Sequence, residues 1–411
     1  MLIETRFREK KWIMLVIWVM TIGLFLQLAG KILFTSGSAN GVYVYLFFII
    51  PSAVASVWLA CKRTEFFSRE VRLFLLSSAM FMGVCSISAA WGDGEYTILY
   101  LLKRSAIILF YLVGVICLIS VSESKYIKTF LLIVCVVAAV GAVVSVGYQL
   151  FVLDKPFGWR TFRITSMGYK DWVYLGHPVI AGVYLGVFAV ISMAVISQEK
   201  STYRYVAIAA LLAMLPYIFL TYSRTAWVSG AIAGLFLVFN TRSRVLIWTA
   251  IFLAVVFLMV AGLYFEGFAK EVTDRQFSGR AQGWAWAVKH LSENIFLGHG
   301  YDHTFWKGKF LVHAHNFYLQ VSYEQGLAGL ATLLAMLSIV CKSYWRYRAD
   351  SLVSLGFSLV VYLLLAMLVD IDHVISRPGV YWTIFWFPLA FTLGAVNRVY
   401  LLEKTNRSFS S

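Results

Sequence analysis

Charge is scarce in this chain of 411 residues: charged residues make up 13% of it and hydrophobic residues 61%. The apolar residues form continuous runs of about the 20 residues with which a helix crosses a bilayer. The strands of a membrane β-barrel would instead alternate apolar with polar residues. Because lipid offers backbone N–H and C=O groups no partner, the continuous runs must be helical. The sequence therefore predicts an all-α polytopic membrane protein.

Cysteine is also rare, and its placement excludes two kinds of site. The five cysteines fall within the predicted helices or at their ends, and the sequence has no CxxC pair. No predicted outer loop holds a cysteine pair, which argues against a disulfide framework and against a cysteine-based zinc site. The cysteines are Cys61, Cys85, Cys117, Cys135 and Cys341.

About twelve spanning helices are expected, in a single membrane domain of residues 1–411. Lysine and arginine gather near both termini and in every second connection, and the positive-inside rule places those segments in the cytoplasm. The first apolar run is too long for a signal peptide and lacks a small-residue cleavage site, so we expect it to remain as a helix. The predicted spans are residues 12–34, 42–61, 73–90, 106–121, 130–151, 178–196, 205–221, 226–239, 245–265, 317–341, 352–369 and 381–399.

On this topology all seven histidines lie on the outer side or at outer helix ends, together with cations that oppose the positive-inside trend. Cations kept on the outer face indicate a function. The net charge of +15 divides between cytoplasmic topology signals and this outer group, so it favours membrane lipids and an anionic substrate over nucleic acid. The histidines are His177, His290, His299, His303, His313, His315 and His373.

Residues 266–316 form the larger of two long outer segments, between the ninth and tenth predicted spans. The segment is rich in Trp, Gly and His and has no Ser or Pro runs, so we expect an ordered periplasmic loop that bears part of an active site. A short amphipathic helix, capped by Ser278 or Asp274, carries Arg280 in its first turn. Arginine beside exposed backbone N–H groups favours phosphate, although a snorkelling interfacial arginine has the same pattern.

The segment ends in His313-Ala314-His315-Asn316, whose histidines have three interpretations. A zinc site would have two ligands here but neither a cysteine nor a well-spaced carboxylate. Simple surface histidines are the second interpretation. The third is a general base that removes a proton from a sugar hydroxyl as it attacks. Asn316 is predicted to cap the tenth span, which would fix the orientation of His315.

Three cations stand near the outer ends of spans. Arg224 occupies a tight turn between the seventh and eighth spans, and Lys103 and Arg104 lie near the outer start of the fourth. Each can anchor a lipid headgroup or line an anion pocket.

The other outer connections contribute weaker candidates. Arg163, before the sixth span, can contribute to a surface for glycan or lipid phosphate. Asp372 and Arg377, in the last outer turn, either position arginines and sugar hydroxyls or are merely solvated.

Together these motifs resemble the O-antigen ligase and polysaccharide polymerase superfamily of bacterial inner-membrane glycosyltransferases. The resemblance covers roughly residues 221–377 and the overall pattern of spans. It is carried by Ser223-Arg224-Thr225, by Gly279-Arg280 followed by Trp284, by Gly298-His299-Gly300, and by His315-Asn316 followed by Glu324-Gln325-Gly326-Leu327-Ala328-Gly329.

The resemblance implies transfer of a glycan from undecaprenyl pyrophosphate to an acceptor, without metal, nucleotide or other cofactor. Arg224 and Arg280 match the arginines with which the family holds the pyrophosphate, and we expect the Lys103–Arg104 pair to add to that site. His315 matches the family's histidine base, with His313 as the reserve candidate. A base on the side of the anomeric carbon opposite the leaving group implies inversion.

The acceptor remains open. A ligase places finished O-antigen on a lipid A-core sugar, a polymerase extends a lipid-linked chain, and a protein O-oligosaccharyltransferase modifies a protein hydroxyl. The compact chain with one dominant outer loop favours the ligase, in the inner membrane with its site facing the periplasm. A transporter of the same lipid-linked glycan would show internal repeats and ionisable residues at mid-bilayer, and neither is clear.

Overall fold

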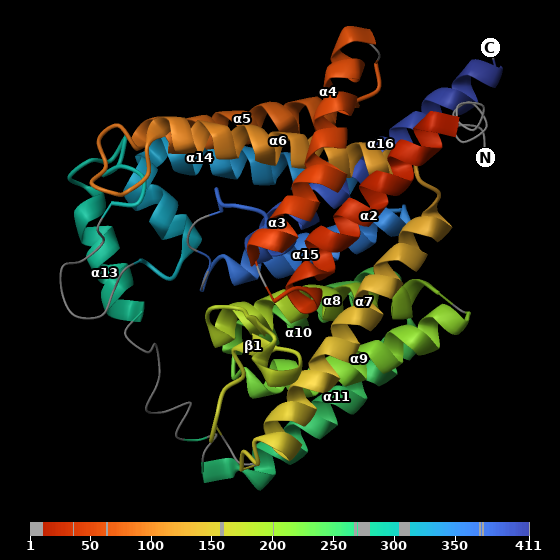
Figure 1. Cartoon of the computed structure of the whole chain (residues 1–411), viewed down its shortest axis with the longest axis vertical. Coiled ribbons are helices and arrows are strands. Elements are labelled where there is room, and N and C mark those ends of the chain that lie inside the picture. Colours follow the sequence, from red (N-terminus) through yellow and green to blue (C-terminus); the bar gives the residue numbers. More distant parts are fainter. Residues whose placement is uncertain are drawn as a thin grey trace.

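The computed structural model is a bundle of helices, which confirms the predicted all-α membrane architecture (Figure 1). The structure describes residues 11–35, 37–62, 65–156, 160–199, 201–266, 269, 280–303, 313–369, 371 and 374–410.

Each predicted span coincides with a helix or a continuous run of helices. In chain order these are α2 (Lys11–Leu33), α3 (Gly37–Val44) with η1 (Tyr45–Ile49) and α4 (Ile50–Lys62), α5 (Arg69–Ser88), α6 (Ile98–Val121), α7 (Ser124–Gly147) with η2 (Tyr148–Val152), α8 (Pro178–Gln198), α9 (Thr202–Leu220), α10 (Arg224–Thr241), α11 (Arg244–Leu263), α14 (Phe317–Tyr347), α15 (Ser351–Ala366), and η4 (Trp382–Trp386) with α16 (Phe387–Ser410).

Within the described residues, ten of these helices or helix runs are long and apolar enough to cross a membrane. Helices α10 and α15, of 18 and 16 residues, are not among the ten, although both lie where spans were predicted. They pack against each other and against α8, so most of the apolar surface of α15 faces protein. The chain is therefore a multi-pass membrane protein whose bundle also contains the shorter helices α10 and α15.

One end of the bundle, the terminal end, holds the start of α2 and the end of α16 (Figure 1). Basic residues of the predicted cytoplasmic connections lie at this end, and several pair with carboxylates of neighbouring helix ends. The pairs are Lys128–Glu199 at 2.7 Å, Lys404–Glu65 at 2.7 Å, Arg346–Glu70 at 3.1 Å and Arg398–Asp350 at 4.0 Å.

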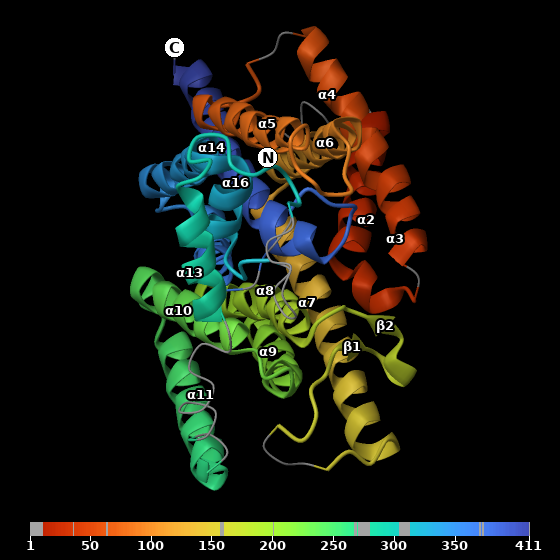
Figure 2. The same cartoon turned by 90° about the vertical axis from the view of Figure 1, so that its left-hand side faces the viewer.

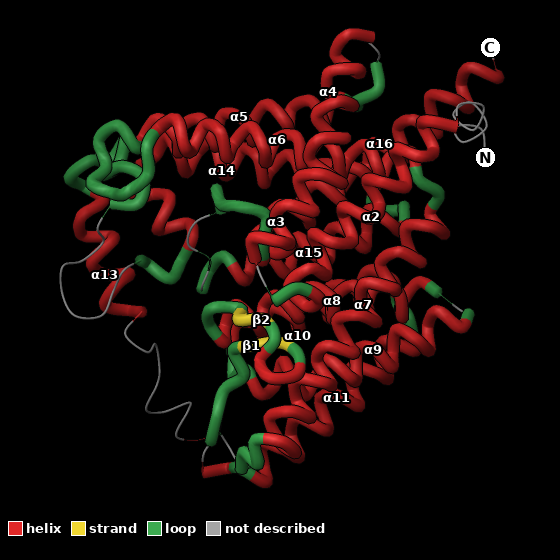
Figure 3. The backbone as a smooth tube through the Cα atoms, viewed as in Figure 1, coloured by secondary structure: helices red, strands yellow, loops and turns green. Residues whose placement is uncertain are grey.

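The opposite end, the loop end, carries the longer connections (Figures 2 and 3). Here lie α13 (Arg280–Leu291) and a small antiparallel pair of strands, β1 (Ser166–Met167) and β2 (Val173–Tyr174), joined through the turn η3 (Tyr169–Asp171). The sequence placed the candidate site residues in these connections.

In the half of the bundle that is drawn below in Figure 1, helix α8 lies at the centre, between α7, α9, α10 and α15. Nearly all of its side chains are buried, whereas α11 lies at the edge with most of its surface exposed. The hydroxyl of Tyr362 on α15 donates a hydrogen bond to the carbonyl of Val183 at 3.0 Å. This close approach depends on Gly186, because a Cβ there would lie 1.9 Å from the Tyr362 hydroxyl oxygen.

We expect Gly186→Ala to destabilise the bundle by about 1–3 kcal/mol, as overpacking of a filled core does. The measurement is the midpoint of thermal unfolding in detergent micelles. Gly83→Ala on α5 is the matched control, because a Cβ there meets no atom within 4 Å and alanine is the better helix former. Equal midpoints for the two variants would contradict the packing argument.

Candidate active site

Helix α14 is broken at Gly326, whose φ of 62° and ψ of −158° are not helical. The segment Ile295–Gly300, which contains the Gly-His-Gly motif, lies against this break. Its backbone pairs with amides and carbonyls of α14 on both sides of Gly326, so polar groups freed by the break are satisfied. The hydrogen bonds are His299 N to Tyr323 O (2.9 Å), Gly300 N to Glu324 O (2.8 Å), Leu327 N to Ile295 O (2.8 Å) and Ala328 N to Phe296 O (3.2 Å).

Two motif glycines make this docking possible. A Cβ on Gly298 would lie 2.4 Å from the carbonyl carbon of Glu324, and a Cβ on Gly326 would lie 2.5 Å from that of Phe296. Both glycines also have positive φ, of +68° and +62°, which other residues adopt only with strain. The two motifs that the sequence analysis singled out separately therefore form one backbone-to-backbone contact.

Helix α13 contacts residues 313–316, here called the histidine loop, through a hydrogen bond and apolar packing. The indole Nε1 of Trp284 donates to the carbonyl of Ala314 at 3.0 Å. Ala314 is fully buried and packs with Ala287 of α13 and Tyr323 of α14. Arg280 is the first residue of α13, one turn before Trp284, and its side chain lies outside the described part of the chain. The predicted short helix thus exists with Arg280 in its first turn, and its predicted caps, Asp274 and Ser278, lie outside the described residues.

The two loop histidines are half-buried neighbours, with ring centroids 4.0 Å apart. His315 has a left-handed backbone (φ +48°), and its amide donates to Nδ1 of His313 at 3.2 Å. A neutral His313 whose Nδ1 accepts this bond carries its proton on Nε2, a tautomer assigned from the hydrogen bond. Asn316 caps α14 as predicted, since its Oδ1 accepts from Leu319 N at 3.1 Å.

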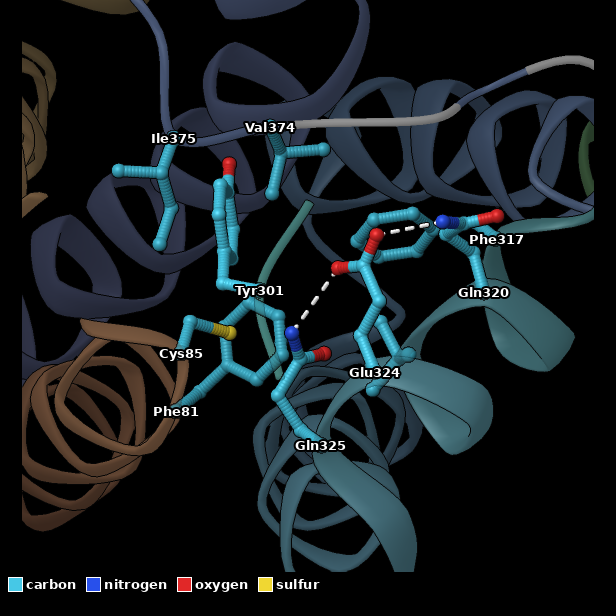
Figure 4. Close-up of a pocket in the computed structure, with 10 residues that line it drawn as sticks. Phe81, Cys85, Tyr301, Phe317, Gln320, Glu324, Gln325, Val374 and Ile375 are labelled. Atoms are coloured by element: carbon cyan, nitrogen blue, oxygen red, sulfur yellow. Dashed lines mark hydrogen bonds between the residues drawn. The ribbon is translucent and has the colours of Figure 1, made fainter. Parts of the chain in front are cut away.

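A buried carboxylate lies directly behind the histidine loop (Figure 4). Glu324 accepts hydrogen bonds from the side-chain amides of Gln320 and Gln325, the latter at 3.0 Å. The amide oxygen of Gln320 in turn accepts from Ala314 N at 2.8 Å. A continuous chain of hydrogen bonds therefore joins the backbone between the two histidines to Glu324, and all three side chains are almost fully buried.

The sequence analysis missed this network, although the spacing of Gln320 and Glu324 by four residues places both on one helix face. The small cavity beside them, about 10 Å³, has room for a water molecule but not for a sugar (Figure 4). Tyr301 lines it from the opposite side, and burial, followed by the nearby Glu324 carboxylate, raises the pKa of Tyr301 well above its ordinary value. The phenol is therefore a neutral part of this wall.

The turn that carries Arg224 is held by the outer segment before α8. Tyr222 has a left-handed backbone (φ +48°), and Ser223 caps α10 by accepting from Ala226 N at 3.2 Å. Arg163 donates from Nε to the carbonyl of Thr221 at 2.8 Å. The structure thus brings Arg163 and the half-exposed Arg224, far apart in sequence, to the same turn.

A second pair of predicted cations meets at Tyr100 on α6. Arg104 and Arg377 both interact with the Tyr100 hydroxyl, and the Arg104 guanidinium also lies 4.9 Å from the Tyr100 ring centroid. Lys103 is exposed on the neighbouring surface of α6. Asp372 lies outside the described residues.

Other described histidines take structural roles at the loop end. Nδ1 of His177 accepts from Val179 N at 3.3 Å and caps α8. His299 stacks on Tyr323 with ring centroids 4.4 Å apart, and His303 Nδ1 lies 2.8 Å from Asp93 Oδ1. In the part of the chain that the structure describes, no three His, Cys, Asp or Glu side chains form a group suited to a metal ion.

Comparison with known proteins covers this region and most of the chain. Residues 208–334 match a family model described as O-antigen ligase. The chain is also similar to the O-antigen ligase of Pseudomonas aeruginosa, with 26% identity over 380 residues, which is 91% of this chain and 89% of that protein. The family match includes the Arg224 turn, α13 and the histidine loop.

We expect Glu324→Leu to leave the amides of Gln320 and Gln325 without their acceptor, at a cost of about 1–3 kcal/mol per unsatisfied group. The loss should lower the thermal midpoint in micelles and speed hydrogen exchange of the Ala314 amide, which Gln320 now protects. Glu95→Leu, at an exposed position of the same end, is the control. Unchanged exchange at Ala314 would mean that the network does not hold the histidine loop.

Proposed function

Because the chain belongs to the O-antigen ligase superfamily, we propose that it transfers O-antigen polysaccharide from undecaprenyl pyrophosphate to a sugar hydroxyl of lipid A-core. The observation that carries this proposal is the similarity to an O-antigen ligase over 91% of the chain, which favours a ligase over a polymerase or a protein O-oligosaccharyltransferase. The chain acts as one membrane domain of the bacterial inner membrane. Its termini are cytoplasmic, and the loop end, with residues 266–316, faces the periplasm.

In this mechanism Arg224 and Arg280 hold the pyrophosphate of the donor. Each is the first residue of a helix, α10 or α13, where exposed backbone N–H groups add to the attraction for phosphate oxygens. Negative charge grows on the pyrophosphate as the glycosidic bond breaks, so guanidinium groups stabilise the transition state more than the bound donor. Arg163 supports this site by fixing the turn before Arg224. No metal or nucleotide is required for this role.

We assign the general base to His315. It removes the proton of the acceptor hydroxyl as the oxygen attacks the anomeric carbon on the face opposite the pyrophosphate, which inverts the configuration there. His313 suits a donor role better, because its Nδ1 accepts the His315 amide and its Nε2 then carries the proton. The cap by Asn316 and the bond from Trp284 to Ala314 hold the loop on both sides of His315.

The decisive experiment deletes the gene in its host and analyses lipopolysaccharide and lipid-linked glycan after complementation with wild-type protein or variants. We expect the deletion and His315→Ala to lose all attached repeats while lipid-linked polymer accumulates. His177→Asn is the matched control, because asparagine retains the cap of α8, and it should restore the full ladder.

Two other outcomes contradict the ligase assignment. Lipid A-core that bears a single repeat would indicate a polymerase. An unchanged ladder after deletion would exclude both activities and point to another acceptor or to transport.

Arg224→Gln should reduce transfer about 10- to 100-fold, the effect of losing one charge-assisted hydrogen bond to the leaving group. Arg244→Gln is the control: Arg244 likewise begins a helix after a capping serine, but it lies at the terminal end. The measurement is the transfer rate of purified protein in nanodiscs at equal protein abundance. A similar loss in both variants would mean that arginine at a helix start matters only for folding.

A further inference from the structure

Arg104 and Arg377 converge on one tyrosine although they come from different elements. Arg104 lies in the second turn of α6, and Arg377 precedes η4 near the C-terminal end of the chain. Both side chains interact with the Tyr100 hydroxyl. Arg104 is oriented from its other side by the hydroxyl of Tyr45, to which its Nη1 donates at 2.8 Å.

This pair of guanidiniums has no carboxylate partner within salt-bridge distance among the described residues, unlike several cations of the terminal end. The Nε of Arg104 is also buried without a hydrogen-bond partner in the same part of the chain. Two like charges that share one neutral hydroxyl repel each other, and a buried unsatisfied donor adds to that cost. An anion that accepts from both guanidiniums would remove both costs.

The surroundings of the pair indicate where this anion comes from. Leu99 and Leu102 flank the site on α6 and are 77% and 45% exposed, and Tyr43 and Phe47 present stacked, exposed rings near Tyr45. In a membrane such apolar surface faces lipid, so a lipid molecule can reach the arginines sideways from the bilayer. A soluble anion would need no such apolar flank.

The Arg104–Arg377 pair also lies apart from the Arg224 turn. Helix α6 belongs to the upper layer of the bundle and α10 to the lower layer in both views (Figures 1 and 2). Helix α6 contacts α2, η1, α4, α5 and α16, whereas α10 contacts α8, α9, α11 and α15. The helices that contact α6 and those that contact α10 are different ones, so the Arg104–Arg377 pair and the Arg224 turn stand on separate parts of the bundle.

We infer that Arg104 and Arg377 bind a phosphate group carried by a membrane lipid, at a site separate from Arg224. The inference rests on the proposed function for the identity of the lipid. Both the lipid A-core acceptor and the lipid-linked donor carry phosphate, and both would approach from the same leaflet. The Tyr100–Tyr96–Tyr301 ring contacts run from this site to Tyr301, which lines the small cavity beside Gln320, and Gln320 in turn accepts from the Ala314 amide of the histidine loop. The site therefore orients whichever lipid it holds relative to that loop.

The test measures binding of two lipids to the purified full-length protein in micelles by native mass spectrometry. The probes are lipid A and undecaprenyl diphosphate, each beside its dephosphorylated form. We expect Arg104→Gln with Arg377→Gln to weaken one phosphorylated lipid about tenfold or more and to leave the dephosphorylated forms unchanged. Loss of lipid A binding identifies the acceptor as the source, and loss of undecaprenyl diphosphate binding identifies the donor.

Lys155→Gln with Lys170→Gln removes the same charge from the same end and should bind both lipids as the wild type does. Equal affinity of the arginine double variant and the wild type overturns the inference, as does an equal loss in the lysine control, which would indicate nonspecific attraction. If the double variant does not fold, the same binding measurement is made on Arg377→Gln alone, because Arg377 is exposed and its substitution should not disturb folding. We expect this single variant to lose part of its affinity for the phosphorylated lipid. Binding is measured without transfer, so this result and that of the gene deletion can fail independently.

Discussion

The contact on which the loop end depends is the docking of Ile295–Gly300 into the break of α14 at Gly326. A helix interrupted near a membrane surface exposes amides and carbonyls that must find partners. The Gly-His-Gly segment supplies them at backbone distance, which is possible only because neither chain has a Cβ at the closest points. This contact fixes the first turns of α14, and the histidine loop extends from them.

The histidine loop is then fixed from two directions. From outside, Trp284 of α13 holds the carbonyl of Ala314; from inside, Gln320 holds its amide and is itself held by Glu324. A fully satisfied buried network of this kind favours one conformation, because any alternative leaves a polar group unpaired. A left-handed residue such as His315 persists where its neighbours impose it in this way.

Charge is arranged differently at the two ends of the bundle. At the terminal end several lysines and arginines pair with carboxylates, so their positive charge serves topology and helix packing. At the loop end the Arg104–Arg377 pair meets around a neutral tyrosine, and Arg224 and Arg280 begin helices, where the dipole disfavours cations. Such arrangements cost stability in isolation and become favourable when phosphate is bound.

The sequence by itself determined the helical membrane architecture, the positions of the predicted spans and the cap at Asn316, because apolar runs and capping residues act locally. It also indicated which residues belong to the candidate site. Only the tertiary structure decided which of them meet. That Gly298 faces Gly326, that Glu324 supports Ala314, and that Arg104 approaches Arg377 depend on contacts between residues distant in sequence, which no local pattern encodes.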